Sequence, residues 1–218
     1  MTKRGFYKRW LAANGLAEAV GLGTTFTIGN LLAPTLEQTS DVPTVFLGAF
    51  GAVVLGMLLE GVVVGFAQET VLLREVHDLR PRSWIAATSI GAGLAWLIGM
   101  VPSTIFALSS PESHAPAGEP GPVLQYALAG VMGLVLGPIL GSAQWVVLRR
   151  HIPRAFRWLW ANALAWAVGM PLIFLGMDFV PWTGPKTGIV LSIYVVCGFA
   201  GVAVGAIHGW FLERWLRD

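Results

Sequence analysis

The sequence predicts an all-α integral membrane protein with six transmembrane helices, arranged as three repeated helical hairpins with pseudo-threefold symmetry. Three observations lead to this prediction. The chain has 218 residues, of which 55% are apolar and only 12% are charged, whereas about a quarter of the residues in a soluble domain are charged. The basic residues gather in alternate connections between apolar segments, and one pattern recurs at a spacing of 74 residues.

Six segments are long and apolar enough to cross a bilayer, which takes about 20 residues because roughly 30 Å of hydrocarbon is crossed at about 1.5 Å per residue. They lie at residues 10–34, 43–72, 84–108, 123–148, 158–177 and 187–212. The connections are short, so we expect residues 1–218 to form a single transmembrane domain. The only cysteine, Cys197, lies in an apolar segment, and an intramolecular disulfide is excluded.

Thirteen of the fourteen lysine and arginine residues flank the segments on one side, and only Lys186 lies on the other. They are Lys3, Arg4, Lys8, Arg9, Arg74, Arg80, Arg82, Arg149, Arg150, Arg154, Arg157, Arg214 and Arg217. The positive-inside rule therefore predicts that both termini are cytoplasmic. The outer connections, near residues 37–41, 109–122 and 178–186, are expected to be surface turns. A net charge of +2 is too small to indicate a nucleic-acid partner.

The repeat is clearest at the start of the odd-numbered segments. A shift of 74 residues superposes Trp10, Trp84 and Trp158, then Asn14, Thr88 and Asn162, and then Gly21, Ala95 and Gly169. The even-numbered segments share the pattern G-x-x-x-G-x-x-Q-x-x-x-L-x-R. Its members are Gly61, Gly65, Gln68, Leu72 and Arg74; Gly137, Gly141, Gln144, Leu148 and Arg150; and Gly201, Gly205, His208, Leu212 and Arg214. The hairpins span about residues 3–76, 77–152 and 153–218, and a closed ring is the simplest arrangement, with a flat row of hairpins as the alternative.

The repeated residues suggest packing and anchoring roles. In lipid, helices associate through close approach over small residues, so the six glycines of the even-segment pattern predict helix contacts. The arginines that end this pattern, Arg74, Arg150 and Arg214, are expected to reach lipid headgroups. Trp10, Trp84 and Trp158 lie beside the basic connections and are expected to anchor the helices at the membrane interface.

The polar residues of the repeat lie at similar depths inside the basic side of the membrane. We call this set the polar belt; it consists of Asn14, Gln68, Thr88, Gln144, Asn162 and His208. A buried unpaired amide costs several kcal/mol, so we expect these groups to hydrogen bond to one another across helices. The belt then either joins the helices or lines a cavity that opens to the cytoplasm.

Two glutamates depart from the repeat and are functional candidates, because ionisable residues are costly within membrane helices. Glu18 stands where the other hairpins have Ala92 and Trp166, and we expect it to contact His208 in a closed ring, as a site for a proton or a cation or as a static hydrogen-bonded group. Glu60 lies about 21 Å along its helix from the basic end, so it is expected to lie too far out to join this pair. No metal site is expected, since zinc normally takes three or four ligands.

The stretch GSAQWVVLRRHIPRAFRW, which starts at Gly141, resembles a loosely defined set of uncharacterised bacterial membrane proteins that carry a G-x-x-Q-W-x-x-L-R-R turn before a Trp-rich span. This resemblance implies a bacterial inner membrane location and no activity. It covers mainly the second half of the chain.

No G-x-S-x-G, H-E-x-x-H, P-loop or Rossmann pattern occurs, so no enzymatic activity is predicted. No cofactor is predicted either. Bound lipid is expected, with a quinone or pigment among the aromatic residues as the alternative. The favoured function is a packing or accessory subunit that associates with lipid and with other membrane subunits or itself. The alternative is a small transporter or proton or ion channel with its path near the threefold axis.

Overall fold

The computed structural model describes residues 4–37, 42–76, 78–109 and 121–216. These residues form helices and turns and no strand. The helices are α1 (Arg4–Glu37), α2 (Val42–Leu55), the π-helical turn η1 (Gly56–Gly61), α3 (Val62–Leu72), α4 (Pro81–Ser109), α5 (Pro122–Leu148), α6 (Arg157–Met177) and α7 (Lys186–Trp215). Lys3, Arg217 and most of the first two outer connections lie outside the described residues.

Within this described part of the chain, six helical spans are long and apolar enough to cross a membrane, as the sequence predicts. One of them is continuous from α2 through η1 into α3. Proline helps to define where several spans start. Pro81 and Pro122 open α4 and α5, and Pro185 directly precedes α7, because proline has the backbone angle of a first helical turn and needs no hydrogen-bond acceptor for its nitrogen.

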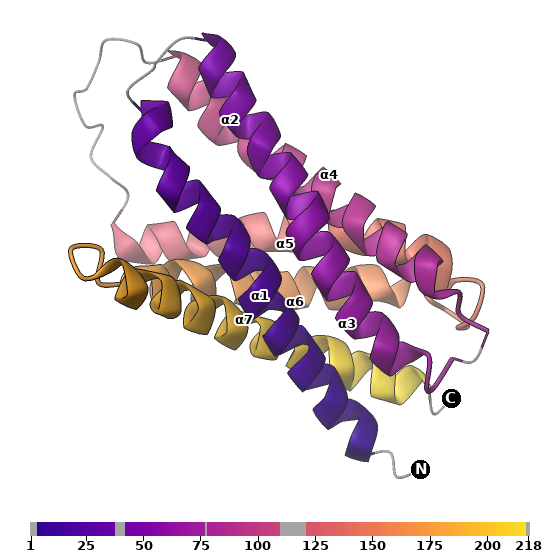
Figure 1. Ribbon diagram of the computed structural model, residues 1–218. Coiled ribbons are helices and arrows are strands. Elements are labelled where there is room, and N and C mark those ends of the chain that lie inside the picture. Colours follow the sequence, from indigo (N-terminus) through magenta and orange to yellow (C-terminus); the bar gives the residue numbers. More distant parts are fainter. Residues whose placement is uncertain (1–3, 38–41, 77, 110–120, 217–218) are drawn as a thin grey trace.

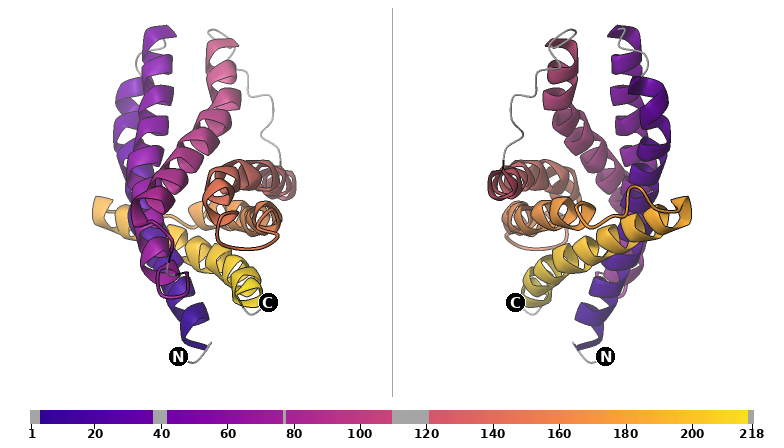
Figure 2. Two further views of the ribbon diagram at one scale, coloured as in Figure 1. Left: turned by 90° about the vertical axis from the view of Figure 1, so that its right-hand side faces the viewer. Right: turned by 90° about the vertical axis from the view of Figure 1, so that its left-hand side faces the viewer.

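The six spans form a closed circuit of contacts. α1 packs on η1 and α3, these pack on α4, and α4, α5, α6 and α7 follow in order. α7 then packs along α1, so the arrangement is a ring and not the flat row of hairpins. Figure 2 shows α5 and α6 nearly end-on, whereas α1, α2 and α4 run up the picture. The helices α5 and α6 therefore cross α1, α2 and α4 steeply.

The two ends of the bundle differ in charge. One end holds the start of α1, the end of α7 and the connections from α3 to α4 and from α5 to α6 (Figure 1). We call it the basic end, because Lys8, Arg9 and the arginines of both connections lie there. Lys186 begins α7 at the opposite end. Between the ends, large apolar side chains such as Phe50, Phe66 and Phe199 are exposed on the outside of the bundle, as expected for a surface that faces lipid.

Candidate functional site

The basic end is closed by three packed tryptophans. Trp10, Trp84 and Trp158 are all 0% exposed and belong to one apolar cluster with Leu72, Leu148 and Leu212. Trp158 lies between the other two indoles, with ring centroids 6.4 Å from Trp10 and 6.3 Å from Trp84. The predicted interfacial anchoring by these tryptophans is therefore wrong, because their repeated position faces the bundle interior and not the headgroups.

The three arginines that are also expected to anchor the helices differ from these tryptophans in their exposure. Arg74, Arg150 and Arg214 are exposed at the basic end. The guanidinium of Arg214 lies 3.8 Å from the centroid of the Trp210 ring, a cation–π contact at the surface of α7. Their positions leave all three available to lipid phosphates.

The polar belt lies next to the tryptophans, and its hydrogen bonds join residues of five helices. Gln68 Nε2 of α3 donates to Asn14 Oδ1 of α1 over 2.9 Å. Gln144 Nε2 of α5 donates to Gln68 Oε1 over 3.2 Å and to Thr88 Oγ1 of α4 over 3.0 Å. Trp158 Nε1 of α6 donates to Gln144 Oε1 over 2.9 Å. The expected hydrogen bonding across helices is thus observed for four of the six belt residues, with Gln144 at its centre, and not for Asn162 and His208.

The smaller belt residues also bond to their own helices. Asn14, Thr88 and Asn162 each donate to the backbone carbonyl four residues earlier, which belongs to a core tryptophan. Asn162 Oδ1 has no hydrogen-bond partner in the described part of the chain. Asn162 instead packs under Gly141, where a Cβ atom on the glycine would lie 2.8 Å from its Nδ2. Five of the six belt residues are therefore fastened by side-chain hydrogen bonds, and the exception is His208.

The glycines of the even-numbered spans lie very close to the neighbouring helices α1, α4 and α6. A Cβ on Gly205 of α7 would lie 2.9 Å from Asn14 Cβ, and a Cβ on Gly65 of α3 would lie 2.9 Å from the Cα of Ile85 in α4. Gly61, Gly137 and Gly201 lie equally near to α4, α6 and α1, respectively. These approaches bring belt side chains on neighbouring helices within hydrogen-bonding distance.

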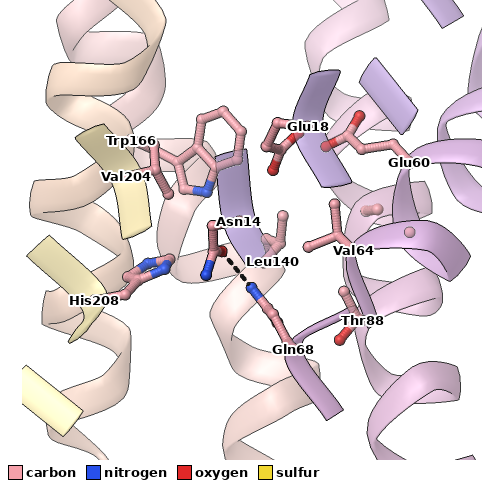
Figure 3. A pocket seen from close by; sticks show the side chains of 12 residues that line it. Asn14, Glu18, Glu60, Val64, Gln68, Thr88, Leu140, Trp166, Val204 and His208 are labelled. Atoms are coloured by element: carbon pink, nitrogen blue, oxygen red, sulfur yellow. Dashed lines mark hydrogen bonds between the residues drawn. The ribbon is translucent and has the colours of Figure 1, made fainter. Parts of the chain in front are cut away.

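A small cavity, which we call the acidic pocket, lies on the side of the belt that faces away from the basic end (Figure 3). Its volume is about 10 Å³, which is about the least that a site needs to hold one water molecule. Glu18 from α1 and Glu60 from η1 line it and face one another, and His208 from α7 lines it beyond Asn14. The exposed fractions of these three side chains are only 3%, 5% and 2%.

The expected contact between Glu18 and His208 is not formed. Both ring nitrogens of His208 and the Oε2 atom of Glu18 are without hydrogen-bond partners in the described residues. The His208 ring instead packs on Trp158, with centroids 4.8 Å apart and planes inclined by 37°. The two side chains share a pocket, but the imidazole is held by an aromatic ring and not by the carboxyl group.

The sequence-based position of Glu60 is also wrong. Glu60 lies with Glu18 in the acidic pocket and not in a separate outer site. The prediction measured depth from Trp10 on one helix and from Arg74 on the other. These starting points are not equivalent, because Trp10 is fully buried and Arg74 is exposed, and Gly21, about one turn after Glu18, packs against Glu60. Glu60 also belongs to η1, whose wider π-helical turn changes the direction of its side chain, a geometry that is frequent at functional sites.

Two glycines and one tryptophan hold Glu60 in place. A Cβ on Gly21 would lie 2.8 Å from the Cα of Glu60, so this glycine allows α1 to approach η1 closely. Gly56, the first residue of η1, packs under the Trp96 ring, where no side chain would fit. Trp96 Nε1 donates to Glu60 Oε2 over 2.7 Å and fixes the carboxyl group at the edge of the pocket.

A second and larger space, the apolar cavity, adjoins the acidic pocket. Its volume is about 400 Å³, and it lies among α1, η1, α4, α5 and α6. Glu60, Leu140 and Trp166 line both spaces, so the carboxyl group of Glu60 stands where the two meet. The other lining side chains of the apolar cavity are aliphatic, aromatic or methionine. The arrangement is an apolar space with an acidic end, which suits cation or proton binding.

Sequence reasoning missed Trp96, although a signal for it exists. Leu22, Trp96 and Met170 are separated by 74 residues, so Trp96 departs from the repeat as Glu18 does. Glu69, buried on α3 with an exposed fraction of 6%, was also not singled out.

Among the described residues, no group of three His, Cys, Asp or Glu side chains is placed to hold a metal ion. No family model, curated protein or solved structure matches the chain.

Proposed function

We propose that this chain is a non-enzymatic multi-pass membrane protein that carries a proton or a small cation at Glu18 and Glu60, as a small transporter. The observation behind this proposal is the meeting of two buried carboxyl groups at one pocket, whose lining includes no lysine or arginine among the residues that the structure describes. Charged groups are costly inside a membrane and are kept mainly on ion or proton pathways. A bound proton or cation removes the repulsion between two such carboxylates.

The closed basic end favours a carrier over an open channel. The hydrogen-bonded amides of the belt and the three packed indoles fill the bundle between Glu18 and the basic end. A cation that reaches Glu60 from the apolar cavity therefore needs a rearrangement of helices before it leaves at the basic end. Such alternating exposure of a site near the middle of the membrane is typical of secondary transporters.

The proposal includes three repeated hairpins around a pseudo-threefold axis that passes through the acidic pocket. The lining of this pocket supports it, because the pocket contains two complete sets of repeat-related residues. The sets are Glu18, Ala92 and Trp166, and Val64, Leu140 and Val204. Gly65 against Thr88, Gly141 against Asn162 and Gly205 against Asn14 are three similar contacts, which also agree with this symmetry.

We further propose that the basic end faces the cytoplasm of a bacterial cell, with lipid headgroups bound by Arg74, Arg150 and Arg214. Two single-cysteine variants are made in a Cys197→Ala background to test the orientation. Thr183→Cys lies in the turn before α7, and Ser83→Cys lies near the start of α4. A membrane-impermeant maleimide added to intact cells is expected to label Thr183→Cys alone. Labelling of Ser83→Cys alone would show that the basic end faces outward and would overturn the proposed orientation.

A second candidate function is a packing or accessory subunit of a larger membrane complex. The self-satisfied hydrogen bonds of the belt favour it, because they describe a static core, and the exposed outer phenylalanines offer a surface that other subunits can cover. In this case the carboxyl groups are buried for structure and do not exchange a proton or a cation.

Flux in liposomes separates the two candidates. The purified chain is reconstituted with a potassium gradient, valinomycin sets the membrane potential, and an enclosed pH-sensitive dye reports proton entry. We expect flux from the native chain, loss of most of it in Glu18→Gln and Glu60→Gln, and no change in Glu75→Gln, an exposed glutamate paired with Arg9 at the basic end. If proton flux is absent, the same variants are compared for sodium and potassium uptake. Absence of all three fluxes in the native chain would favour the accessory subunit.

A further inference from the structure

We propose that the apolar cavity binds a lipophilic amine, with its apolar body among the methionine and aromatic side chains and its ammonium group at Glu60. This proposal names a substrate class for the acidic site and rests on the function proposed above. The cavity volume of about 400 Å³ lies in the range of sites for small organic ligands, which are mostly apolar with a few polar groups.

The charge of the cavity selects a cation. Among the described residues, Glu60 is the only ionisable side chain in its lining, and it stands at the boundary with the acidic pocket that holds Glu18. No lysine or arginine of the described part of the chain lines either space, so an anionic ligand finds no opposite charge there. The Oε2 atom of Glu18 is buried without a hydrogen-bond partner in the described residues, and an ammonium group at the boundary supplies an opposite charge to it.

The walls of the cavity suit a bulky apolar body. Met100, Met132 and Met170 come from three different helices, α4, α5 and α6, and all line the space. Methionine side chains are flexible and polarizable, so surfaces rich in them accept ligands of varied shape. Phe26 and Phe174 add flat aromatic faces. This composition predicts selection by charge and apolar bulk, with little discrimination between ring systems.

The head of the site is already oriented. The hydrogen bond from Trp96 holds one oxygen of Glu60, and the indoles of Trp96 and Trp166 line the same end of the cavity. Tryptophan faces attract cations, and the attraction is strongest away from water. An amine therefore finds a carboxylate and two indole rings together, whereas a neutral alcohol of the same shape gains only a hydrogen bond.

The test compares 1-pyrenemethylamine with 1-pyrenemethanol, which share the same ring system and differ in charge. Binding to the native chain in detergent micelles is followed by energy transfer from tryptophan to pyrene, with empty micelles as the background. We expect saturable binding of the amine at least tenfold tighter than that of the alcohol. Glu60→Gln is expected to weaken amine binding at least tenfold and to change alcohol binding by less than about threefold, which corresponds to under 1 kcal/mol.

Two further variants keep the test interpretable. Met132→Trp places a large side chain in the cavity and is expected to weaken both ligands, while Glu75→Gln is expected to alter neither. Folding of each variant is checked by the protection of Cys197, which is fully buried, from a maleimide. Equal amine binding in native protein and in folded Glu60→Gln, or saturable binding that Met132→Trp leaves unchanged, would overturn the proposal.

The binding and flux measurements test the two proposals independently. Amine binding without proton, sodium or potassium flux removes the proposed carriage of a proton or small cation and leaves the amine site. Proton flux that depends on Glu18 and Glu60, without saturable amine binding, removes the amine site and leaves a proton carrier.

Discussion

Replacing Gln144 by leucine removes the centre of the polar belt at nearly constant side-chain volume. The native side chain makes three hydrogen bonds, to Gln68, to Thr88 and from Trp158. Its loss leaves Gln68 Oε1 and Trp158 Nε1 buried without these partners, whereas the Thr88 hydroxyl still donates to Trp84. Two buried polar groups are thus orphaned by one substitution.

Two magnitudes bracket the expected effect. Interhelical hydrogen bonds in a membrane average about 0.6 kcal/mol, which gives about 2 kcal/mol for three of them. An orphaned buried polar group costs about 1–3 kcal/mol, which gives about 2–6 kcal/mol for two of them. We expect Gln144→Leu to lower the free energy of unfolding by about 2–4 kcal/mol, from the first figure to the middle of the second range.

The assay is reversible unfolding by SDS in mixed micelles, followed by tryptophan fluorescence. Gln125→Leu, on the same helix but half-buried and without a side-chain hydrogen bond in the described part of the chain, is the matched control and should change stability by less than about 0.5 kcal/mol. A double-mutant cycle of Gln144→Leu with Trp158→Phe should give a coupling of about 1 kcal/mol. A loss below 0.5 kcal/mol for Gln144→Leu, roughly that of the control, would refute the belt as a stabilising network.

Three further predictions use the same unfolding assay or a simple labelling experiment. Gly201→Ala adds a Cβ atom 2.6 Å from the Cβ of Glu18 and should cost about 1–3 kcal/mol, whereas Gly188→Ala, with open space around it on the same helix, should be neutral or stabilising; equal effects would contradict the close packing of α7 on α1. Arg154 adopts a φ of 54°, which is unfavourable for residues with a Cβ atom, so Arg154→Gly should raise the free energy of unfolding by about 1 kcal/mol, and destabilisation would contradict this backbone conformation. Cys197 is 0% exposed, so a membrane-permeant maleimide should label it only after SDS unfolding; rapid labelling of the folded chain would show that this part of α7 is open.

The spans could be predicted from the sequence because two strong signals coincide in it. Apolar length alone locates the helices, and the observed α5 (Pro122–Leu148) and α6 (Arg157–Met177) each start one residue before the predicted span and end at the predicted residue. The recurrence of polar residues at one depth also predicted that belt side chains would bond to one another. The hydrocarbon of a membrane offers polar side chains no hydrogen-bond partners, so residue type and depth were sufficient to predict these bonds.

The acidic pocket was only half predicted, because its geometry depends on features that have no sequence signal. The π-helical turn at η1 and the close approach of α1 over Gly21 together bring Glu60 to Glu18, and neither follows from the spacing of residues along one helix. The misplacement of the core tryptophans has another cause. An indole near a basic turn suits both an interface and a core, and only the direction of its helix face distinguishes them.

Departure from the repeat is a better guide to the site than the repeat itself. In the proposed threefold arrangement, identical side chains face one another around the axis and can satisfy only symmetric demands, such as close packing and mutual hydrogen bonding. A directional site for one cation needs unlike neighbours. Glu18, Glu60 and Trp96 each replace an apolar or small residue of the other hairpins, and all three lie at or beside the acidic pocket. Restoring the repeat there, as Glu18→Ala or Trp96→Leu does, should therefore abolish cation binding while the hydrogen-bonded belt is kept, and loss of the belt in these variants would contradict this separation of roles.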